Sequence, residues 1–139
     1  MLKKAFAIAK AAHAGQVDLA GKPYMEHVVR VSLSVPCGGA KIVALLHDVV
    51  EDTPWTLEML AAEGFSPEVL VGVEAVTHRK GESYKDYVER VKANPLAVLV
   101  KLADLADNMD LSRLPGPLSE ADLYRMKKYE KSKATLEGE

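Results

Sequence analysis

The stretch AKIVALLHDVVEDT, residues 40–53, decides the fold because it joins an apolar helix to four ionisable side chains. Between residues 40 and 50, apolar side chains fall on nearly every face of a helix: Ile42, Val43, Leu45, Leu46, Val49 and Val50. A helix that is apolar all round is buried at the centre of a domain. The pattern therefore predicts a central helix from about Ala40 to Val50.

Helical spacing continues on both sides of this central helix. Apolar residues recur every three or four positions, and no run alternates strictly as a half-buried strand does. Ser66 as an N-cap, followed by Pro67 and Glu68, is typical of a helix start. We expect further helices at about 2–14, 23–35, 57–63, 67–76, 83–93, 95–110 and 119–136. The sequence predicts an all-α bundle.

Length and composition narrow the class of protein. With 139 residues, 48% of them hydrophobic, the chain suits one core, so we expect a single domain over residues 1–139. A formal charge of −2 without a basic cluster argues against nucleic-acid polymers as partners. The single cysteine, Cys37, fits a reducing cytoplasm, and no apolar run is long enough for a membrane span. The sequence leaves the oligomeric state open.

Four ionisable residues crowd the end of the central helix: His47, Asp48, Glu51 and Asp52. Burying carboxylates without partners costs several kcal/mol each, and negative charge opposes the dipole at a helix C-terminus. A divalent cation would offset both effects. In the alternative interpretation, Glu51 and Asp52 are simply solvated where the helix ends.

Two other helices carry polar residues at core-like positions. Asp104, Asp107 and Asn108 interrupt an apolar helix, and Asp104 and Asn108 share one face. His27 lies among valines, where a histidine is more often a hydrogen-bonded core residue than a ligand. Together, two imidazoles and two carboxylates make a plausible shell for manganese, iron, zinc or magnesium.

Four motifs in this order carry a resemblance to a known family: AHAGQ (12–16), GKPYMEH (21–27), ALLHDVVEDT (44–53) and VKLADLADN (100–108). The chain resembles the HD-domain metal-dependent phosphohydrolases, in particular the (p)ppGpp hydrolase domain of the Rel/SpoT enzymes of the stringent response and the small alarmone hydrolases. The resemblance implies an all-helical HD bundle. It also implies one metal ion, usually manganese, with the ligands His27, His47, Asp48 and Asp104.

The resemblance assigns further roles around this metal. It implies that Glu51 and Asp52 handle the attacking water, and that Asn108 is a pocket residue. Tyr129 resembles a pocket tyrosine of the small hydrolases, although a tyrosine at helical spacing is more often a packing residue.

The chain departs from the family where the nucleotide is held. Asp18 and Leu19 stand where the family usually has an Arg-Lys pair, and three further positions lack the usual cations: Leu105, Asp107 and Asp110. Aspartate cannot replace an arginine that clamps a phosphate. Five other cations are candidates to supply the missing positive charge: Lys22, Arg79, Lys80, Lys101 and Arg113. Of these, we assign Lys22 to substrate binding.

These features favour a metal-dependent phosphohydrolase that acts on a small phosphorylated metabolite. We expect a nucleotide, with (p)ppGpp as the candidate; the family would remove its 3′-diphosphate as pyrophosphate. The alternative is a non-catalytic nucleotide sensor that keeps the metal scaffold, but a sensor has no need of the Glu51–Asp52 pair. A helical scaffold without a ligand would leave the charge of HDVVED unexplained.

Overall fold

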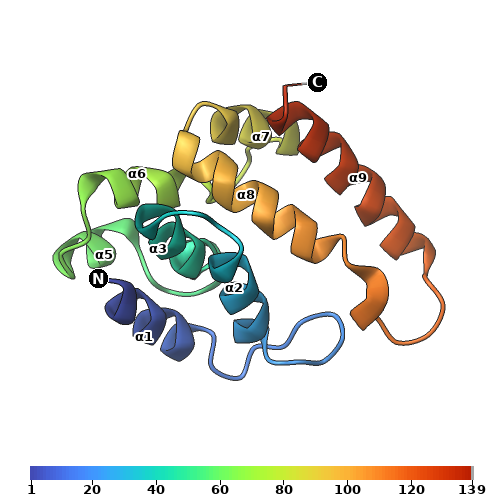
Figure 1. The fold of residues 1–139 in the computed structure, drawn as a ribbon, viewed down its shortest axis with the longest axis horizontal. Helices are drawn as coiled ribbons and strands as arrows, with labels where there is room; N and C mark the ends of the chain where they lie inside the picture. The colour runs from blue at the N-terminus through green and yellow to red at the C-terminus, as the bar shows by residue number, and fades with distance from the viewer. Residues whose placement is uncertain (139) are drawn as a thin grey trace.

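The computed structural model describes residues 1–138, which form an all-α fold (Figure 1). Within this range the only extended pairing is an isolated bridge between Val17 and Pro23. The helices are α1 (Leu2–Ala12), α2 (Tyr24–Leu33), α3 (Gly38–Leu46), α4 (Val49–Asp52), α5 (Leu57–Ala62), α6 (Pro67–Ala75), α7 (Tyr84–Lys92), α8 (Pro95–Asn108), the 3₁₀ turn η1 (Leu111–Arg113) and α9 (Glu120–Leu136). The predicted fold class is confirmed.

The apolar helix α3 lies at the centre of the fold, packed against α1, α2, α6 and α8 (Figure 1). Val43 and Leu46 are fully buried there. The helix α6 approaches closely because Gly72 has no side chain: a Cβ at that position would meet Val43 Cγ2 at 3.0 Å. The core therefore holds the elements around α3 in fixed positions.

The central helix is shorter than the sequence predicts. It ends at Leu46, and the His-Asp pair forms a break before the short helix α4. At this break His47 Nδ1 lies 2.5 Å from the carbonyl oxygen of Ala44, and Asp48 has φ −108° and ψ −1°. This sparsely populated backbone region is frequent at active sites. Because the backbone turns here, α4, which carries Glu51 and Asp52, does not continue along the axis of α3.

Side-chain caps mark several helix starts. Ser66 Oγ accepts a hydrogen bond from the backbone N–H of Val69, which confirms the N-cap expected there. Ser119 and Asp122 form a reciprocal capping box that begins α9. These caps fix where α6 and α9 enter the bundle. In the described residues, no helix is long and apolar enough to cross a membrane.

Two connections extend toward the same side of the molecule. The loop that joins α1 to α2 runs along the lower edge of Figure 1 toward the segment that joins α8 to α9, which lies at the lower right. They project beyond the ends of α2 and α8, the two helices that carry His27 and Asp104. The fold therefore places residues of both connections close to His27.

Candidate metal centre and adjoining cavity

His27, His47, Asp48 and Asp104 come together in space. Each offers one ligand atom, and these atoms all lie within 4.8 Å of one another. They come from α2, from the break after α3 and from α8. His27, His47 and Asp104 are only 4%, 3% and 5% exposed, so the group sits inside the core rather than on the surface.

Both imidazoles turn the same ring nitrogen toward the centre of this cluster. His47 Nδ1 donates to the Ala44 carbonyl at 2.5 Å, and His27 Nδ1 donates to Asp107 Oδ2 at 2.5 Å. The Nε2 atoms of His27 and His47 then lie 2.9 Å and 3.2 Å from the same Asp104 oxygen, Oδ1. An outward Nδ1–H bond that leaves Nε2 free is the usual arrangement of a metal-binding histidine.

The two carboxylates are held from outside the cluster as well. Lys101 Nζ donates to Asp104 Oδ2 at 3.0 Å, which fixes the oxygen that faces away from His27 and His47. The Tyr24 hydroxyl donates to Asp48 Oδ2. Each candidate ligand therefore has a partner that sets its orientation, a supporting arrangement that metal sites depend on.

The cluster strongly perturbs the ionisation of its members. Burial opposes charge on both histidines, but the surrounding carboxylates outweigh it and raise the pKa of His27 and His47 above the ordinary 6.5. Burial also disfavours the charged form of Asp104, yet Lys101 and the two histidines hold its pKa well below 3.8. Without a metal ion, the cluster thus keeps carboxylates charged by holding protons on the imidazoles.

This donor set fits a divalent metal ion. Two imidazole nitrogens with two carboxylate oxygens form a mixed shell of the kind used for manganese, iron and zinc. A cation would take the place of the protons between Nε2 and the carboxylates. The convergence of all four donors on one point is the observation that supports metal binding.

Glu51 and Asp52 lie on α4, directly after the break that carries His47 and Asp48. Both side chains are exposed, and Glu51 Oε1 accepts a hydrogen bond from the backbone N–H of His78 at 2.7 Å. Partial desolvation and the nearby Asp48 raise the pKa of both carboxyl groups. A carboxylate with a raised pKa is a better proton acceptor, as a general base requires.

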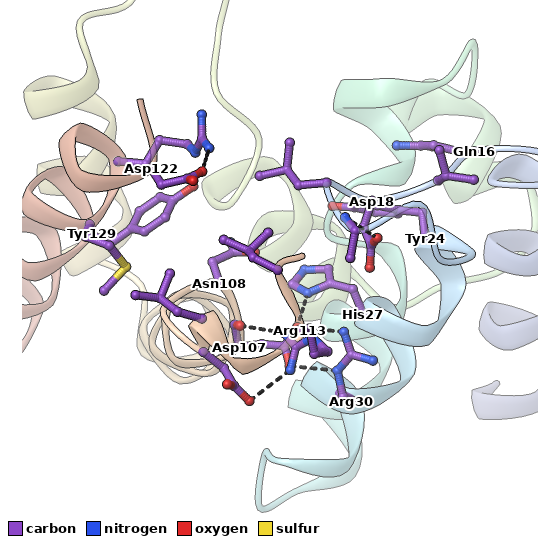
Figure 2. A pocket seen from close by; sticks show the side chains of 18 residues that line it. Gln16, Asp18, Tyr24, His27, Arg30, Asp107, Asn108, Arg113, Asp122 and Tyr129 are labelled. Carbon is purple, nitrogen blue, oxygen red and sulfur yellow. Dashed lines mark hydrogen bonds and ion pairs between the residues drawn. The ribbon is translucent and has the colours of Figure 1, made fainter. Parts of the chain in front are cut away.

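A cavity of about 300 Å³ adjoins the cluster, and His27 is the candidate ligand that lines it. Its wall combines the loop after α1 with parts of α2, α8, η1 and α9. Figure 2 shows Tyr129 and Asp122 on one side and Tyr24 and Asp18 on the other. This volume lies at the lower end of the range for small-molecule sites.

Three arginines line this cavity, and each is paired with an aspartate. Arg30 and Arg113 both contact Asp107, at 2.8 Å and 3.3 Å, and Arg125 contacts Asp122. The cavity thus contains cations, but not on the loop where the family usually has them. A negatively charged substrate would have to compete with these aspartates for the guanidinium groups.

The other predicted site residues occupy different places. Asn108 lines the cavity and its Nδ2 lies 3.4 Å from Asp104 Oδ1, and Tyr129 also lines the cavity. Lys22 is exposed and is not part of the cavity wall. Asp18 lines it, but its Oδ1 accepts the backbone N–H groups of Ala20 and Lys22, both at 2.9 Å.

Three further candidate cations lie outside the cavity wall. Arg79 pairs with Glu74 at 3.1 Å on the surface, and Lys101 forms an ion pair with Asp104. Lys80 is exposed and lies outside the cavity wall. Of the five cations considered from the sequence, Arg113 is the one that lines the cavity.

Sequence reasoning assigned no supporting role to three residues, Tyr24, Arg30 and Asp107, although Asp107 stood out as a polar residue in an apolar helix. Tyr24 and Arg30 lie three positions before and after His27 on α2, so a shared helix face was the available signal. No local pattern could show that Asp107 lies against His27, because the two are 80 positions apart in the chain. The link between them is a product of the tertiary fold.

Comparisons with known proteins agree with this fold and site. No protein-family model matches the chain. It is 33% identical over 134 residues to a probable GTP pyrophosphokinase of Mycobacterium leprae, and 36% identical over 116 residues to a guanosine-3′,5′-bis(diphosphate) 3′-pyrophosphohydrolase of Haemophilus influenzae. These matches cover 87% and 73% of this chain, but the chain spans 17% of each relative's length.

A solved structure gives a match along nearly the whole chain. It is a metazoan orthologue of SpoT that hydrolyses ppGpp, with a TM-score of 0.79 and 27% sequence identity. The match covers 97% of this chain and 84% of that one. The fold is thus the all-α HD-type fold of a hydrolase domain. More particularly, this chain is a homologue of the SpoT/RelA-type (p)ppGpp 3′-pyrophosphohydrolases, which confirms the resemblance seen in its motifs.

Proposed function

We propose that this chain is a metal-dependent phosphohydrolase that cleaves a small nucleotide of the ppGpp type. The observation that carries the proposal is the convergence of four donors, three of them buried and Asp48 half-buried, within 4.8 Å and beside a cavity of about 300 Å³. Relatives named as guanosine-3′,5′-bis(diphosphate) 3′-pyrophosphohydrolases support the same chemistry. For a 3′-diphosphate nucleotide, the products are pyrophosphate and the nucleotide with a free 3′-hydroxyl.

His27, His47, Asp48 and Asp104 would hold the metal, with manganese as the proposed ion. When bound, such an ion acidifies water and polarises a phosphoryl oxygen. Glu51 and Asp52 orient the attacking water and accept its proton, a role suited to carboxyl groups whose pKa is raised. Asn108 and Tyr129 contact the nucleotide from the cavity wall, and Lys22, which lies outside that wall, is proposed as a further substrate contact.

The cellular setting belongs to the same proposal. A single cysteine and a formal charge of −2 support a cytoplasmic enzyme whose partner is a small molecule rather than a nucleic-acid polymer. The long relatives carry much additional sequence, so their other activities are not part of this proposal.

The test is pyrophosphate and phosphate release from a panel of nucleotides that includes ppGpp and pppGpp. We expect turnover with manganese and none after removal of metal by a chelator. Nucleotide binding without any turnover, under conditions that load the metal, would favour the alternative of a non-catalytic sensor. The intact Glu51–Asp52 pair is the feature that favours an enzyme.

A further inference from the structure

Asp107 is not one of the four candidate metal ligands, but it contacts one of them, His27. Its Oδ2 atom lies 2.5 Å from His27 Nδ1, the ring nitrogen that points away from the cluster. Arg30 Nε donates to the other oxygen, Oδ1, at 2.8 Å, and Arg113 Nη2 lies 3.3 Å from Oδ2 (Figure 2). The Asp107 carboxylate therefore links α8, which carries it, to α2 and η1, and it contacts the candidate ligand His27.

The surroundings of Asp107 fix the direction of its hydrogen bond to His27. With two guanidinium groups beside it and a side chain 12% exposed, Asp107 remains an anion and offers only acceptor atoms. His27 must then be the donor, and its proton resides on Nδ1. Nε2, which lies 2.9 Å from Asp104 Oδ1, is then the nitrogen that would bind a metal once its own proton is displaced.

The two arginines hold the carboxylate itself in place. Arg30 contacts both oxygens of Asp107, at 2.8 Å and 3.2 Å, in a fork that defines the plane of the group. Arg113 Nη2 also donates to the backbone carbonyl of Asp107 at 2.8 Å, which ties η1 to the end of α8. The carboxylate thus cannot turn away from His27 without losing several charged contacts.

We propose that Asp107 is a positioning residue that sets the tautomer and ring orientation of His27 and thereby the affinity for the metal. The inference rests on the metal site of the proposed function. It adds a determinant outside the four ligands, held by two arginines of the cavity wall. A purely structural role, as an ion-pair link between α2 and α8, would predict lower thermal stability with unchanged metal affinity.

The first experiment compares manganese affinity in the wild type, in Asp107→Asn and in the matched control Asp110→Asn. Asp110 also pairs with Arg113, at 2.9 Å, but it is about half exposed. Losing an outer partner of a metal-bound histidine weakens binding about 10- to 100-fold, which we expect for Asp107→Asn. The control should stay within about twofold, because exposed ion pairs contribute little.

The outcomes separate this inference from the proposed function. If the wild type binds manganese and Asp107→Asn binds it equally well, the positioning role is wrong while the metal site stands. If the wild type binds no divalent metal, the proposed metal site fails, and this inference fails with it.

A second measurement uses the unmodified protein and does not depend on a variant that folds. In the zinc-loaded wild type, nitrogen-15 NMR of the histidine rings should show His27 protonated at Nδ1 and metal-bound at Nε2. A His27 ring bound to zinc through Nδ1, or unprotonated there, would overturn the proposal. A structural ion pair alone would not determine this tautomer.

Discussion

The candidate metal cluster and the wall of the adjoining cavity both contain charged side chains, but the cluster is buried and the wall is partly exposed. In the cluster, the histidines and Asp104 are at most 5% exposed and come from α2, from the break after α3 and from α8, all of which pack in the core. In the cavity wall, Arg30 and Arg113 are 33% and 31% exposed, and much of the wall comes from a loop and a 3₁₀ turn. The cluster is therefore part of the core, whereas much of the cavity wall lies on connecting segments.

This difference teaches that the four candidate ligands and much of the proposed substrate-binding wall rest on different parts of the fold, with Asp107 as the link between them. A cluster built on core helices cannot change without disturbing the packing around α3. A wall built on connections can exchange residues at low cost to stability, as surface loops generally do. The four candidate ligands, which match the family, form the cluster, and the departures at Asp18, Leu19 and Asp110 lie in the wall, although the departure at Leu105 is buried in the core.

The largest effect should follow from Asp104→Ala, which removes a ligand and the partner of Lys101. We expect metal binding and turnover to fall to background. We also expect the apoprotein to lose about 3–5 kcal/mol of stability, because a buried lysine is left without its carboxylate. Elemental analysis measures the metal content and thermal melting measures the stability.

The isosteric variant Asp104→Asn serves as the control for the shape of the site. His27→Ala should also lose metal, because it removes a ligand from another helix. Undiminished metal content in both Asp104→Ala and His27→Ala would contradict the ligand set.

The next largest effect concerns the two carboxylates on α4. Changing Glu51 to Gln together with Asp52 to Asn should lower turnover about 10²- to 10⁴-fold, the usual contribution of general acid–base catalysis. Metal content should stay the same, because neither side chain belongs to the four-ligand cluster. Near wild-type turnover by the double variant would show that these carboxylates do not handle the proton.

Much of the fold could be predicted because it follows from local periodicity. The apolar stretch around Val43 and Leu46 predicts a buried central helix, and Ser66 with Pro67 predicts a helix start. The break at His47 and Asp48 could not be predicted from periodicity, since the apolar pattern continues through Val49 and Val50. There the side chain of His47 bonds the Ala44 carbonyl, a local competition that hydrophobic spacing does not record.

The candidate site was predictable where residue type conflicts with its surroundings. His27 and Asp104 stand out as polar residues on apolar helix faces, and the structure brings them to 2.9 Å. The partners that orient them were not predictable in the same way. Arg30 is half-buried on a face where a charged residue is ordinary, and Asp107, although it interrupts an apolar helix, has no local signal for its partner; only the packing of α2 against α8 pairs them.

A smaller effect, which sharpens the contrast between buried cluster and open wall, is the pH dependence of metal binding. The pKa of His27 and of His47 is raised above 6.5 in the metal-free fold, so protons on these rings stabilise the apoprotein at low pH. That stabilisation is lost as the pH rises through the raised values. A metal needs both rings neutral, so its affinity should increase over the same range, by about tenfold per pH unit for each proton displaced.

The measurement is the melting temperature with and without manganese at several values between pH 6 and pH 8.5. The stabilisation by manganese should grow with pH in the wild type and be absent in Asp104→Asn. A shift that is independent of pH would show that the histidines are already neutral in the metal-free protein.

The smallest effect concerns the cavity wall, where the chain departs from the family. Leu19 is 69% exposed and lines the cavity, so Leu19→Lys should restore one cation at low structural cost. An exposed charge contributes up to about 1 kcal/mol, so we expect a few-fold lower KM for ppGpp with kcat unchanged. Adding Asp18→Arg should not help, because the Asp18 carboxylate holds the backbone N–H groups of Ala20 and Lys22.

The matched control is Leu33→Lys, which adds the same charge at a leucine that is 75% exposed and outside the cavity wall. Steady-state kinetics on ppGpp measure the effect, and we expect weak wild-type activity on this substrate. An efficient wild type that Leu19→Lys does not improve would show that Arg30, Arg113 and Arg125 already supply the charge.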